Sequence, residues 1–570
     1  MPTPRSLTTA AHEDVDLRVV SGEWPTDLRG EVLFSSPQIS GRTDYGIFDF
    51  GAMHRLSLRP GERGAAPDAL AWRARSIQSP AKRLFDAAPD LFVGGPIGYS
   101  SPFGSPNCAN TAPLPWGDRL YATWDAGRPV ELHPDTLEYV ADVGHVDTWG
   151  GPSMGGETVL PFLMSTAHPV VDPERDCLWT AKLEPVMEPT FGMRPSVVRY
   201  DGTGTAVQHW PLDGVAFSGS VHTVSQTREW VILADSGNFK ADPDEIFGGE
   251  RTLTIDEAVP VWLIRKDVLE ATPSGTPVTA TTLMMAPPSG HYYARYDDAD
   301  GISVVWEGMD LMDLALYMRP DDVDVNGQPV DPAVVGLYNM AMAPETLVEV
   351  LFDPDTGQVK EQGIFKEDWA FNLQLSGMDW TLEGLSDPTL HHVAYQGCRP
   401  GRISGRAARL YADRIDRSAV AEDTPGSLAS FRRGSMELVS RWEYPDVADL
   451  ITSPTFVPRQ APDGSATRYA GEDPGGHDGY VVQPVFNDDG FRVELFDAAK
   501  VGAGPVATAR PVDGRCMPLL LHSAWMPTTT TLVDAERLRF SDELTAERLA
   551  SVPEEHRDLV RGVAAEIDGA

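Results

Sequence analysis

The sequence predicts an all-β protein in which many short strands follow one another over most of the chain. Runs such as DRLYATWDAG, PVWLIRKD and GISVVWEG hold four to eight residues of β-type composition, and Gly, Pro, Asn or Asp bound each run. Strands at this regular spacing, without alternating helices, are typical of a propeller or of an array of sandwiches. Because no strict repeat of the WD or kelch type is present, the pattern alone leaves these two architectures open.

The domain organisation follows from length and from the spread of turn residues. A chain of 570 residues is long enough for several average domains or for one large all-β domain with insertions. Gly and Pro occur throughout, and polar excursions such as residues 460–477 are typical of loops and not of interdomain linkers. We therefore expect a single domain over residues 1–570, with the β body over about residues 15–530 and a C-terminal helical extension over residues 531–570. Pro553 interrupts the helical pattern of that extension.

Composition excludes several classes of protein. A formal net charge of −38 would repel the phosphates of a nucleic acid and disfavours a purely electrostatic attachment to anionic membranes. The chain holds no apolar run of about 18 residues, as a membrane span requires, and its N-terminus lacks the apolar core of a secretory signal. Its four cysteines are scattered without a CxxC pair, which is typical of reduced thiols. We expect a soluble cytoplasmic protein that binds no nucleic acid.

Four of the thirteen histidines lie at one end of an apolar, strand-like run, next to small residues that allow neighbouring backbone to approach closely. They are His168 in MSTAHPVVDP, His222 in SGSVHTVSQT, His291 in PPSGHYYARY and His522 in LLLHSAWMP. Five others lie in polar termini or beside turn residues, where solvated side chains are the rule: His12, His133, His145, His209 and His556. A lone histidine in an apolar run is more often a buried structural residue than a ligand. The spacing of the four histidines therefore has to show whether they could share one site.

That spacing is compatible with one shared site. Steps of 54, 69 and 231 residues separate His168, His222, His291 and His522 in turn. A seven-bladed propeller in this chain would use roughly 75 residues per blade, which places the first three on consecutive blades and the fourth about three blades on. Because innermost strands converge on the propeller axis, the side chains could meet there. Several neutral imidazoles suit Fe, Cu, Zn or Ni and do not suit Mg or Ca. Four independent structural histidines are the alternative.

Segments in one order along nearly the whole chain resemble motifs of the carotenoid cleavage oxygenase family. Residues 16–37 (DLRVVSGEWPTDLRGEVLFSSP) and 48–58 (FDFGAMHRLSL) are similar to its opening segments. Residues 107–144, which begin NCANTAPLPWGDRLYATWDAG, follow its pattern "ANT…GRLLALWEGG" with few departures. MSTAHPVVDPERDCLW, VHTVSQTREWVILAD and LHSAWMP match three further motifs, and HYYARYDD matches more loosely. Each motif is short, but their shared order identifies the sequence as a member of this family.

The resemblance implies a seven-bladed β-propeller with a helical and loop cap over an axial metal site. In the family four histidines hold Fe(II), and the matching positions here are His168, His222, His291 and His522. The family also uses three glutamates to orient these ligands.

The positions of those glutamates differ in this chain. Asp125 in ATWDAG takes the place of the first, and Glu383 in TLEGLSDP is the expected second. The third position falls near GGHDGY, where Gly476 or His477 stands in place of an acid. The group that orients His522 is therefore left unassigned.

The resemblance further implies a dioxygenase that uses O2 to cleave a carbon–carbon double bond of a small, apolar, conjugated substrate, giving two carbonyl products without a protein acid or base. Family members act on carotenoids and apocarotenoids or on stilbene-like phenylpropanoids. Stilbene-cleaving members carry a lysine at the position of Trp124, and an indole offers stacking area but no ammonium to stabilise a phenolate. A carotenoid or apocarotenoid is therefore favoured. Stilbene cleavage, isomerisation without cleavage and an iron-free binding propeller are the alternatives.

A polyene substrate comes from lipid, so an apolar entrance is expected. Residues 84–98 (LFDAAPDLFVGGPIG) are the best candidate for this entrance and for a peripheral membrane contact during substrate uptake. Packing of the same segment under the propeller is the alternative. Beyond substrate and O2, no partner is expected, and the protein is predicted to be a monomer or a weak oligomer.

Overall fold

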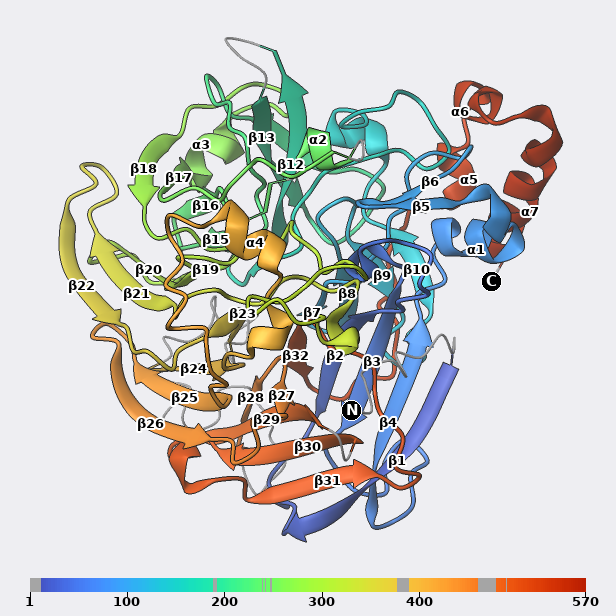
Figure 1. The fold of residues 1–570 in the computed structure, drawn as a ribbon. Coiled ribbons are helices and arrows are strands. Elements are labelled where there is room, and N and C mark those ends of the chain that lie inside the picture. The colour runs from blue at the N-terminus through green and yellow to red at the C-terminus, as the bar shows by residue number, and fades with distance from the viewer. Residues whose placement is uncertain are drawn as a thin grey trace.

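The structure is a computed structural model that describes residues 12–187, 192–237, 239–240, 242–246, 249–376, 389–459, 478–487 and 490–569. These residues form an all-β, propeller-like body of five four-stranded antiparallel sheets and one ten-stranded sheet, arranged around a common centre (Figure 1). A separate hairpin joins β5 (Val93–Gly95) to β6 (Gly98–Ser100). The predicted all-β class and the propeller-like architecture are confirmed.

Each four-stranded sheet uses four strands that are consecutive in the chain, paired in chain order. The first two sheets contain β7 (Ala112–Trp116), β8 (Arg119–Thr123), β9 (Val130–Leu132) and β10 (Tyr139–Asp142), then β11 (Val170–Asp172), β12 (Cys177–Val186), β13 (Gly192–Tyr200) and β14 (Gln208–Pro211). The third contains β15 (Val224–Gln226), β16 (Trp230–Ala234), β17 (Val259–Arg265) and β18 (Thr281–Met285). The last two contain β19 (Tyr292–Ala294), β20 (Ile302–Gly308), β21 (Thr346–Phe352) and β22 (Val359–Phe365), then β23 (Asn372–Ser376), β24 (Leu390–Tyr395), β25 (Ser427–Arg432) and β26 (Glu437–Glu443).

The ten-stranded sheet combines strands from both ends of the chain. Its members are β1 (His12–Gly22), β2 (Glu31–Pro37), β3 (Gly51–Ser57), β4 (Ala69–Ser76), β27 (Leu450–Ile451), β28 (Thr455–Pro458), β29 (Gly479–Asn487), β30 (Gly490–Asp497), β31 (Ala507–Pro511) and β32 (Ser523–Met526). β1 pairs with β4 along one edge and with β31 along the other, and so merges the early and late strands. The expectation of seven separate blades is therefore not confirmed: the described residues form five separate four-stranded sheets, and continuous pairing through β1 joins the remaining strands.

Apolar side chains on both faces of the strands hold neighbouring sheets together. In β16, Val231 and Leu233 pack with the second sheet, whereas Ile232 and Ala234 pack with the fourth. Alternate residues of a strand point to opposite faces, so a strand between two sheets is apolar on both. All five residues of β16 are buried, which explains the continuous apolar run WVILA in the sequence.

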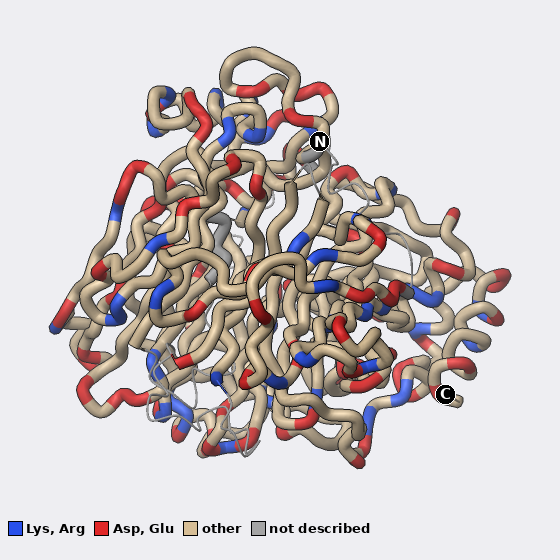
Figure 2. Tube along the Cα trace, turned by 90° about the horizontal axis from the view of Figure 1, so that it is seen from below, with Lys and Arg blue, Asp and Glu red and all other residues tan. Residues whose placement is uncertain are grey.

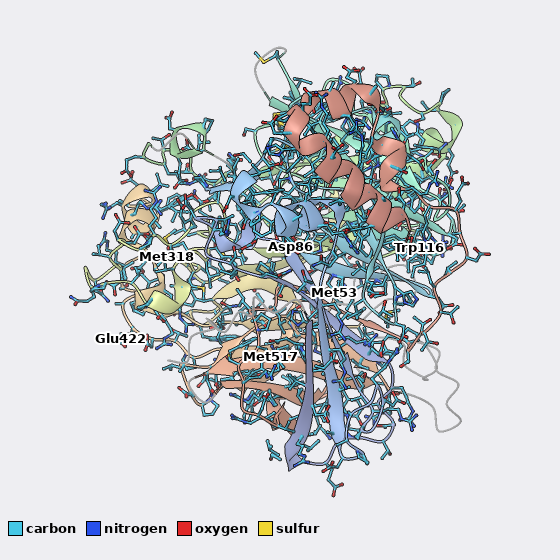
Figure 3. The ribbon with its side chains drawn as sticks, turned by 90° about the vertical axis from the view of Figure 1, so that its right-hand side faces the viewer. Met53, Asp86, Trp116, Met318, Glu422 and Met517 are labelled. Atoms are coloured by element: carbon cyan, nitrogen blue, oxygen red, sulfur yellow. The ribbon has the colours of Figure 1, made fainter. Side chains whose placement is uncertain are left out.

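Helices are short, and most lie outside the sheets. They are α1 (Pro80–Ala87), α2 (Pro243–Ile246), α3 (Lys266–Ala271), α4 (Gly405–Leu410), α5 (Phe540–Glu543), α6 (Ala546–Ser551) and α7 (Arg557–Asp568). Single 3-10 turns occur at η2 (Gly46–Phe48), η3 (Pro89–Leu91), η4 (Val146–Trp149), η5 (Pro332–Val334), η6 (Pro400–Arg402), η7 (Val501–Ala503) and η8 (Glu554–His556). The helices α5, α6 and α7 gather beside α1 at one edge of the molecule (Figures 1 and 3). Within the described residues no helix combines the length and apolar character needed to cross a bilayer.

Charged groups cover the outside of this body. Asp and Glu occur on every side of the outline in Figure 2, interspersed with fewer Lys and Arg, and no single large acidic or basic face stands out. This arrangement is consistent with the net charge of −38 and with a general contribution of charge to solubility.

One buried carboxylate links the fourth and fifth sheets. Glu349 on β21 is 2% exposed and accepts hydrogen bonds from Nε of Arg295 (3.1 Å) and Nε of Arg433 (3.0 Å). Burial alone would raise the pKa of Glu349, but the two guanidinium groups, Arg433 first, outweigh it and lower the pKa to about 2. The carboxylate is therefore ionised at neutral pH, and its charge is matched by residues of two sheets.

We predict that Glu349→Gln lowers the free energy of unfolding by about 3 kcal/mol at pH 7, because it removes the carboxylate that faces the buried guanidinium group of Arg433 and the partly buried one of Arg295. A depressed pKa in the folded state contributes stability above the unfolded pKa of about 4.5 and loses it as pH falls toward 2. The difference from wild type should therefore shrink between pH 4.5 and pH 2, measured by urea unfolding at several pH values. Glu437→Gln, which removes an exposed partner of Arg432, is the control and should change little. A loss of unfolding free energy in Glu349→Gln that does not vary with pH would contradict the assignment of Glu349 as an ionised carboxylate with a lowered pKa.

Candidate metal centre

Four histidines stand at the starts of strands that form the edges of their sheets. His168 lies two residues before β11, His222 two before β15, His291 one before β19 and His522 one before β32. The edge strands of neighbouring sheets contact one another, as β11 does β15 and β15 does β19. The predicted position of each histidine beside an apolar strand is therefore correct, and this position brings residues from distant parts of the sequence to one place.

The four rings surround one point. The ring centroid of His168 lies 4.7 Å from that of His222, 4.7 Å from that of His291 and 4.4 Å from that of His522. One nitrogen from each ring can be chosen so that all four lie within 4.8 Å of one another. Nε2 of His168 and Nε2 of His291 are 3.2 Å apart. Two nitrogens each about 2.1 Å from a single ion and at right angles would be about 3.0 Å apart, so this group could hold a metal ion.

Burial keeps the imidazoles of His168 and His522 in the neutral form that binds metals. His168, His291 and His522 are buried, whereas the side chain of His222 is 18% exposed. Burial and the neighbouring imidazoles, His522 first, hold the pKa of His168 well below its ordinary value. Burial, and then His222, lower the pKa of His522 to about 3. Neutral imidazoles at pH 7 suit Fe, Cu, Zn or Ni, and a site of this kind without carboxylate ligands does not suit Mg or Ca.

Backbone hydrogen bonds fix the separation of the ligand positions. The N–H of His168 donates to the carbonyl of His222 (3.2 Å), and the N–H of Val224 donates to the carbonyl of His168 (3.0 Å). The carbonyl of His522 accepts from the N–H of Ser35 on β2 (3.0 Å). The first two bonds connect the starts of the neighbouring edge strands β11 and β15, and the third ties the residue before β32 to β2, so the backbone of three of the four ligand positions is fixed by the sheets.

Asp125 lies against His222. Its carboxylate oxygens are 2.9 Å and 3.0 Å from Nδ1 of His222, and one of them also accepts the N–H of Ala167 (3.1 Å). A hydrogen bond at Nδ1 leaves Nε2 as the acceptor that faces the other rings. The side chain of aspartate, shorter than the glutamate of the family motif, thus reaches the imidazole. Glu383, the second acid expected from the sequence, lies outside the described residues, as do Gly476 and His477.

An apolar cavity of about 240 Å³ opens onto His222, His291 and His522. Much of its wall is aromatic or aliphatic and includes Phe48, Trp124, Phe162, Phe239, Leu314 and Leu521. Trp124 meets the ring of Phe48 edge to face at 6.4 Å. Trp124, which was singled out in the sequence, therefore lines this cavity next to Asp125.

The sequence did not reveal most of this wall. Phe48 begins the segment FDFGAMHRLSL, so the motif could have indicated it. Phe239 and Leu314 come from long connections between strands, where no motif or periodicity marks a residue that faces a cavity.

The predicted entrance segment, residues 84–98, is divided between core and surface. Leu84 and Phe92 are buried, whereas Val93 and Ile97 at the β5–β6 hairpin are 65% and 52% exposed. Ile97 also lines the cavity, together with Tyr99. The hairpin therefore lies at the mouth of the cavity, and the helical part of the segment packs inward.

No other described group of three or more His, Cys, Asp or Glu residues could hold a metal ion. His54 is buried and bonds to the hydroxyl of Ser36 (2.8 Å). His133 accepts the N–H of Asp135 in the turn after β9 (3.1 Å). These histidines have structural roles, unlike the four that meet at the centre.

Residues 5–527 match the family model described as retinal pigment epithelial membrane protein (RPE65). The chain belongs to the carotenoid cleavage oxygenase family. A curated relative, carotenoid cleavage dioxygenase 7, chloroplastic, from Oryza sativa subsp. japonica, is 31% identical over 153 residues, and the match covers 24% of this chain and 24% of that protein. The family resemblance of the sequence is thus confirmed.

Solved structures of two family members share the fold. The Synechocystis apocarotenoid oxygenase mutant Glu150Gln superposes with a TM-score of 0.57 at 16% identity, over 91% of this chain and 96% of that one. A cobalt-substituted form of that oxygenase gives the same TM-score, identity and coverage. The lignostilbene dioxygenase of Pseudomonas brassicacearum gives a TM-score of 0.57 at 14% identity, over 93% of this chain and 100% of that one.

We predict that His222→Ala removes at least nine-tenths of the bound metal, because one of four converging nitrogens is lost. The protein should stay folded, since the His222 side chain is partly exposed and lies before β15, outside the strands of the sheet. Metal content by inductively coupled plasma mass spectrometry, on protein purified without an affinity tag, tests this together with thermal melting by circular dichroism. His133→Ala is the matched control and should keep its metal. Equal metal content in the two variants would refute the assignment of this centre.

Proposed function

We propose that the protein is a non-haem iron dioxygenase that cleaves a carbon–carbon double bond of a carotenoid or apocarotenoid with O2. The observation that carries this proposal is the group of four converging imidazoles, three of which, those of His222, His291 and His522, line an apolar cavity. Membership of the carotenoid cleavage oxygenase family and the names of the relatives, a carotenoid cleavage dioxygenase and an apocarotenoid oxygenase, support it.

The four imidazoles of His168, His222, His291 and His522 would hold Fe(II), with Asp125 orienting His222 through Nδ1. Fe(II) bound there would supply the binding and activation of O2. Imidazole ligands bring no negative charge to the ion, and the carboxylate of Asp125 places one next to His222. It stabilises the positive charge of the site without occupying a ligand position.

The overall reaction requires no proton transfer by the protein. One C=C bond and one O2 are consumed, and each carbon receives one oxygen atom, so two carbonyl products account for every atom and electron. The chain must therefore position one double bond and exclude water, which is the role of a rigid apolar cavity. Trp124, Phe48 and Phe162 provide flat surfaces against which a conjugated chain can lie.

The residues that line the cavity also indicate the substrate class. A stilbene with a phenolic ring would gain from a cation at the position of Trp124, and the indole offers none. Ile97 and Phe239 extend the apolar lining toward the β5–β6 hairpin. We therefore favour a polyene over a phenolic stilbene, although a lignostilbene dioxygenase shares the fold.

Substrate is proposed to enter past the β5–β6 hairpin. Val93 and Ile97 are exposed there, and Ile97 reaches the cavity. Contact of these two side chains with a lipid surface would let an apolar substrate pass into the cavity without crossing water. Such a contact would be peripheral and apolar, because the negative net charge of the chain opposes electrostatic binding to anionic lipid.

Aerobic incubation of Fe(II)-loaded protein with a panel of carotenoids, apocarotenals and stilbenes tests the function. We expect two carbonyl products from a carotenoid or apocarotenal, located by mass spectrometry, with one ¹⁸O atom in each product when ¹⁸O2 is supplied. Cleavage of stilbenes alone would replace the proposed substrate class by the phenolic one. Isomerised substrate without ¹⁸O would show isomerisation, and an inert, iron-free protein would indicate a binding function.

Trp124 provides a separate test of the substrate class. Trp124→Ala should lower kcat/KM for a polyene about tenfold, because losing one aromatic contact costs about 1–1.5 kcal/mol. Trp124→Phe keeps a flat apolar ring and should restore most of that activity. Trp124→Lys should favour a phenolic stilbene relative to the polyene. Unchanged polyene kinetics in all three variants, measured by steady-state assays, would exclude a contact between Trp124 and substrate.

A further inference from the structure

The C-terminal extension inserts one buried carboxylate against the loop that follows β8. Glu543, the last residue of α5, is 2% exposed and forms a bidentate ion pair with Arg128, at 2.7 Å to Nη1 and 2.8 Å to Nη2. The same carboxylate accepts the N–H of Val146 (2.8 Å). Arg–carboxylate pairs of this form are strong and directional, so Glu543 determines where the guanidinium group of Arg128 lies.

Arg128 belongs to the loop of residues 124–128, which follows β8 and carries both Trp124 and Asp125. Its guanidinium group also donates to the carbonyl of Gly144 (2.6 Å) and to the carboxylate of Asp142 (2.9 Å). Its own carbonyl accepts from the side-chain amide of Asn107 (2.8 Å). The side chain of Arg128 is thus the anchor of this end of the loop, and Glu543 is its bidentate partner.

Hydrogen bonds and close packing also hold the rest of this loop. The hydroxyl of Ser165 donates to the carbonyl groups of Trp124 (3.0 Å) and Gly127 (2.5 Å). A side chain at Gly127 would collide with Asn107. Movement of Arg128 would therefore be transmitted along a short, rigid path to Asp125, whose carboxylate is 2.9 Å from Nδ1 of His222.

Other contacts attach the extension to the body without reaching this loop. Arg537 forms a bidentate pair with Glu131 on β9 (2.8 Å and 2.9 Å). Arg548 bonds to Glu157 (2.7 Å) and Asp147 (2.7 Å). In Figure 3 the C-terminal helices lie over α1, where Asp86 is labelled. The extension is thus attached to the body at several points, and among them the pair of Glu543 with Arg128 is the one that reaches the loop of residues 124–128.

We propose that Glu543 is a positioning residue of the metal centre, because it fixes Arg128 and with it the loop that holds Asp125 against His222. The extension lies beyond residue 527, where the family match ends. A segment outside that match thus takes part in orienting a ligand. This inference rests on the proposed metal-binding function of the four histidines.

The test measures Co(II) binding to the full-length, metal-free protein, using the Kd and the visible absorption spectrum of the bound ion. Glu543→Gln should weaken binding about tenfold and shift the absorption bands, since residues that orient metal ligands typically contribute 10–100-fold to affinity. Arg537→Gln is the matched control: it breaks another bidentate pair between the extension and the same sheet, and its Kd should stay within about twofold of wild type.

A double-mutant cycle separates positioning from general loosening. In an Asp125→Ala background, Glu543→Gln should cause no further loss of Co(II) affinity, because the residue through which it acts is gone. Arg128→Lys keeps the charge but not the bidentate geometry. It should reproduce the spectral shift of Glu543→Gln, which keeps the test decisive if Glu543→Gln is poorly folded by circular dichroism.

The outcomes are distinct. Equal losses in Glu543→Gln and Arg537→Gln, or full additivity with Asp125→Ala, would overturn the positioning role while leaving the metal centre intact. Wild-type protein that binds no Co(II) would overturn the metal centre and the positioning role together. The proposal would be supported if Glu543→Gln and Arg128→Lys change the absorption spectrum of bound Co(II) and Arg537→Gln leaves it as in the wild type.

Discussion

Closure of the body through pairing of its two chain ends is the constraint on which the metal centre depends. β32 pairs with β2, and the carbonyl of His522 accepts the N–H of Ser35 on β2. His522 therefore reaches the other three histidines only when the late strands join the early ones. β1 completes this closure by pairing with β4 and β31. The four histidines consequently come together only when contacts between residues hundreds of positions apart in the chain are in place.

Packing four imidazoles together has a cost that the surrounding structure must offset. Burial and mutual proximity keep His168 and His522 neutral at pH 7, so these two rings do not repel each other as cations. What remains is the loss of hydration of the ring nitrogens. For His222 the carboxylate of Asp125 replaces water at Nδ1, and the edge strands supply the fixed backbone that prevents the rings from separating. Such a site is preorganised for an ion before the ion arrives.

The sequence predicted the four histidines because each lies at a strand start, where a short apolar run and small neighbours are visible locally. It predicted Asp125 and Trp124 because both belong to one continuous motif around β8. The number of separate blades was not predictable in the same way, since pairing of β1 with β31 is a contact between the two ends of the chain. The aromatic wall at Phe239 and the role of Glu543 were missed for a related reason. Both reach the site from long connections or from the extension, and no local pattern encodes such contacts.

The extension also changes how the entrance segment is to be understood. In the sequence, residues 84–98 are a helix-like apolar stretch followed by a glycine loop. In the structure Leu84 packs in one cluster with Val560 and Val563 of α7, so the apolar face of α1 is already covered by the chain itself. What stays exposed at the mouth of the cavity is the hairpin with Val93 and Ile97. A helix lying flat in a membrane buries a broad apolar face, whereas two side chains on a hairpin offer a small contact. A lipid contact at this mouth would therefore be shallow, because only these two apolar side chains of the hairpin could enter it.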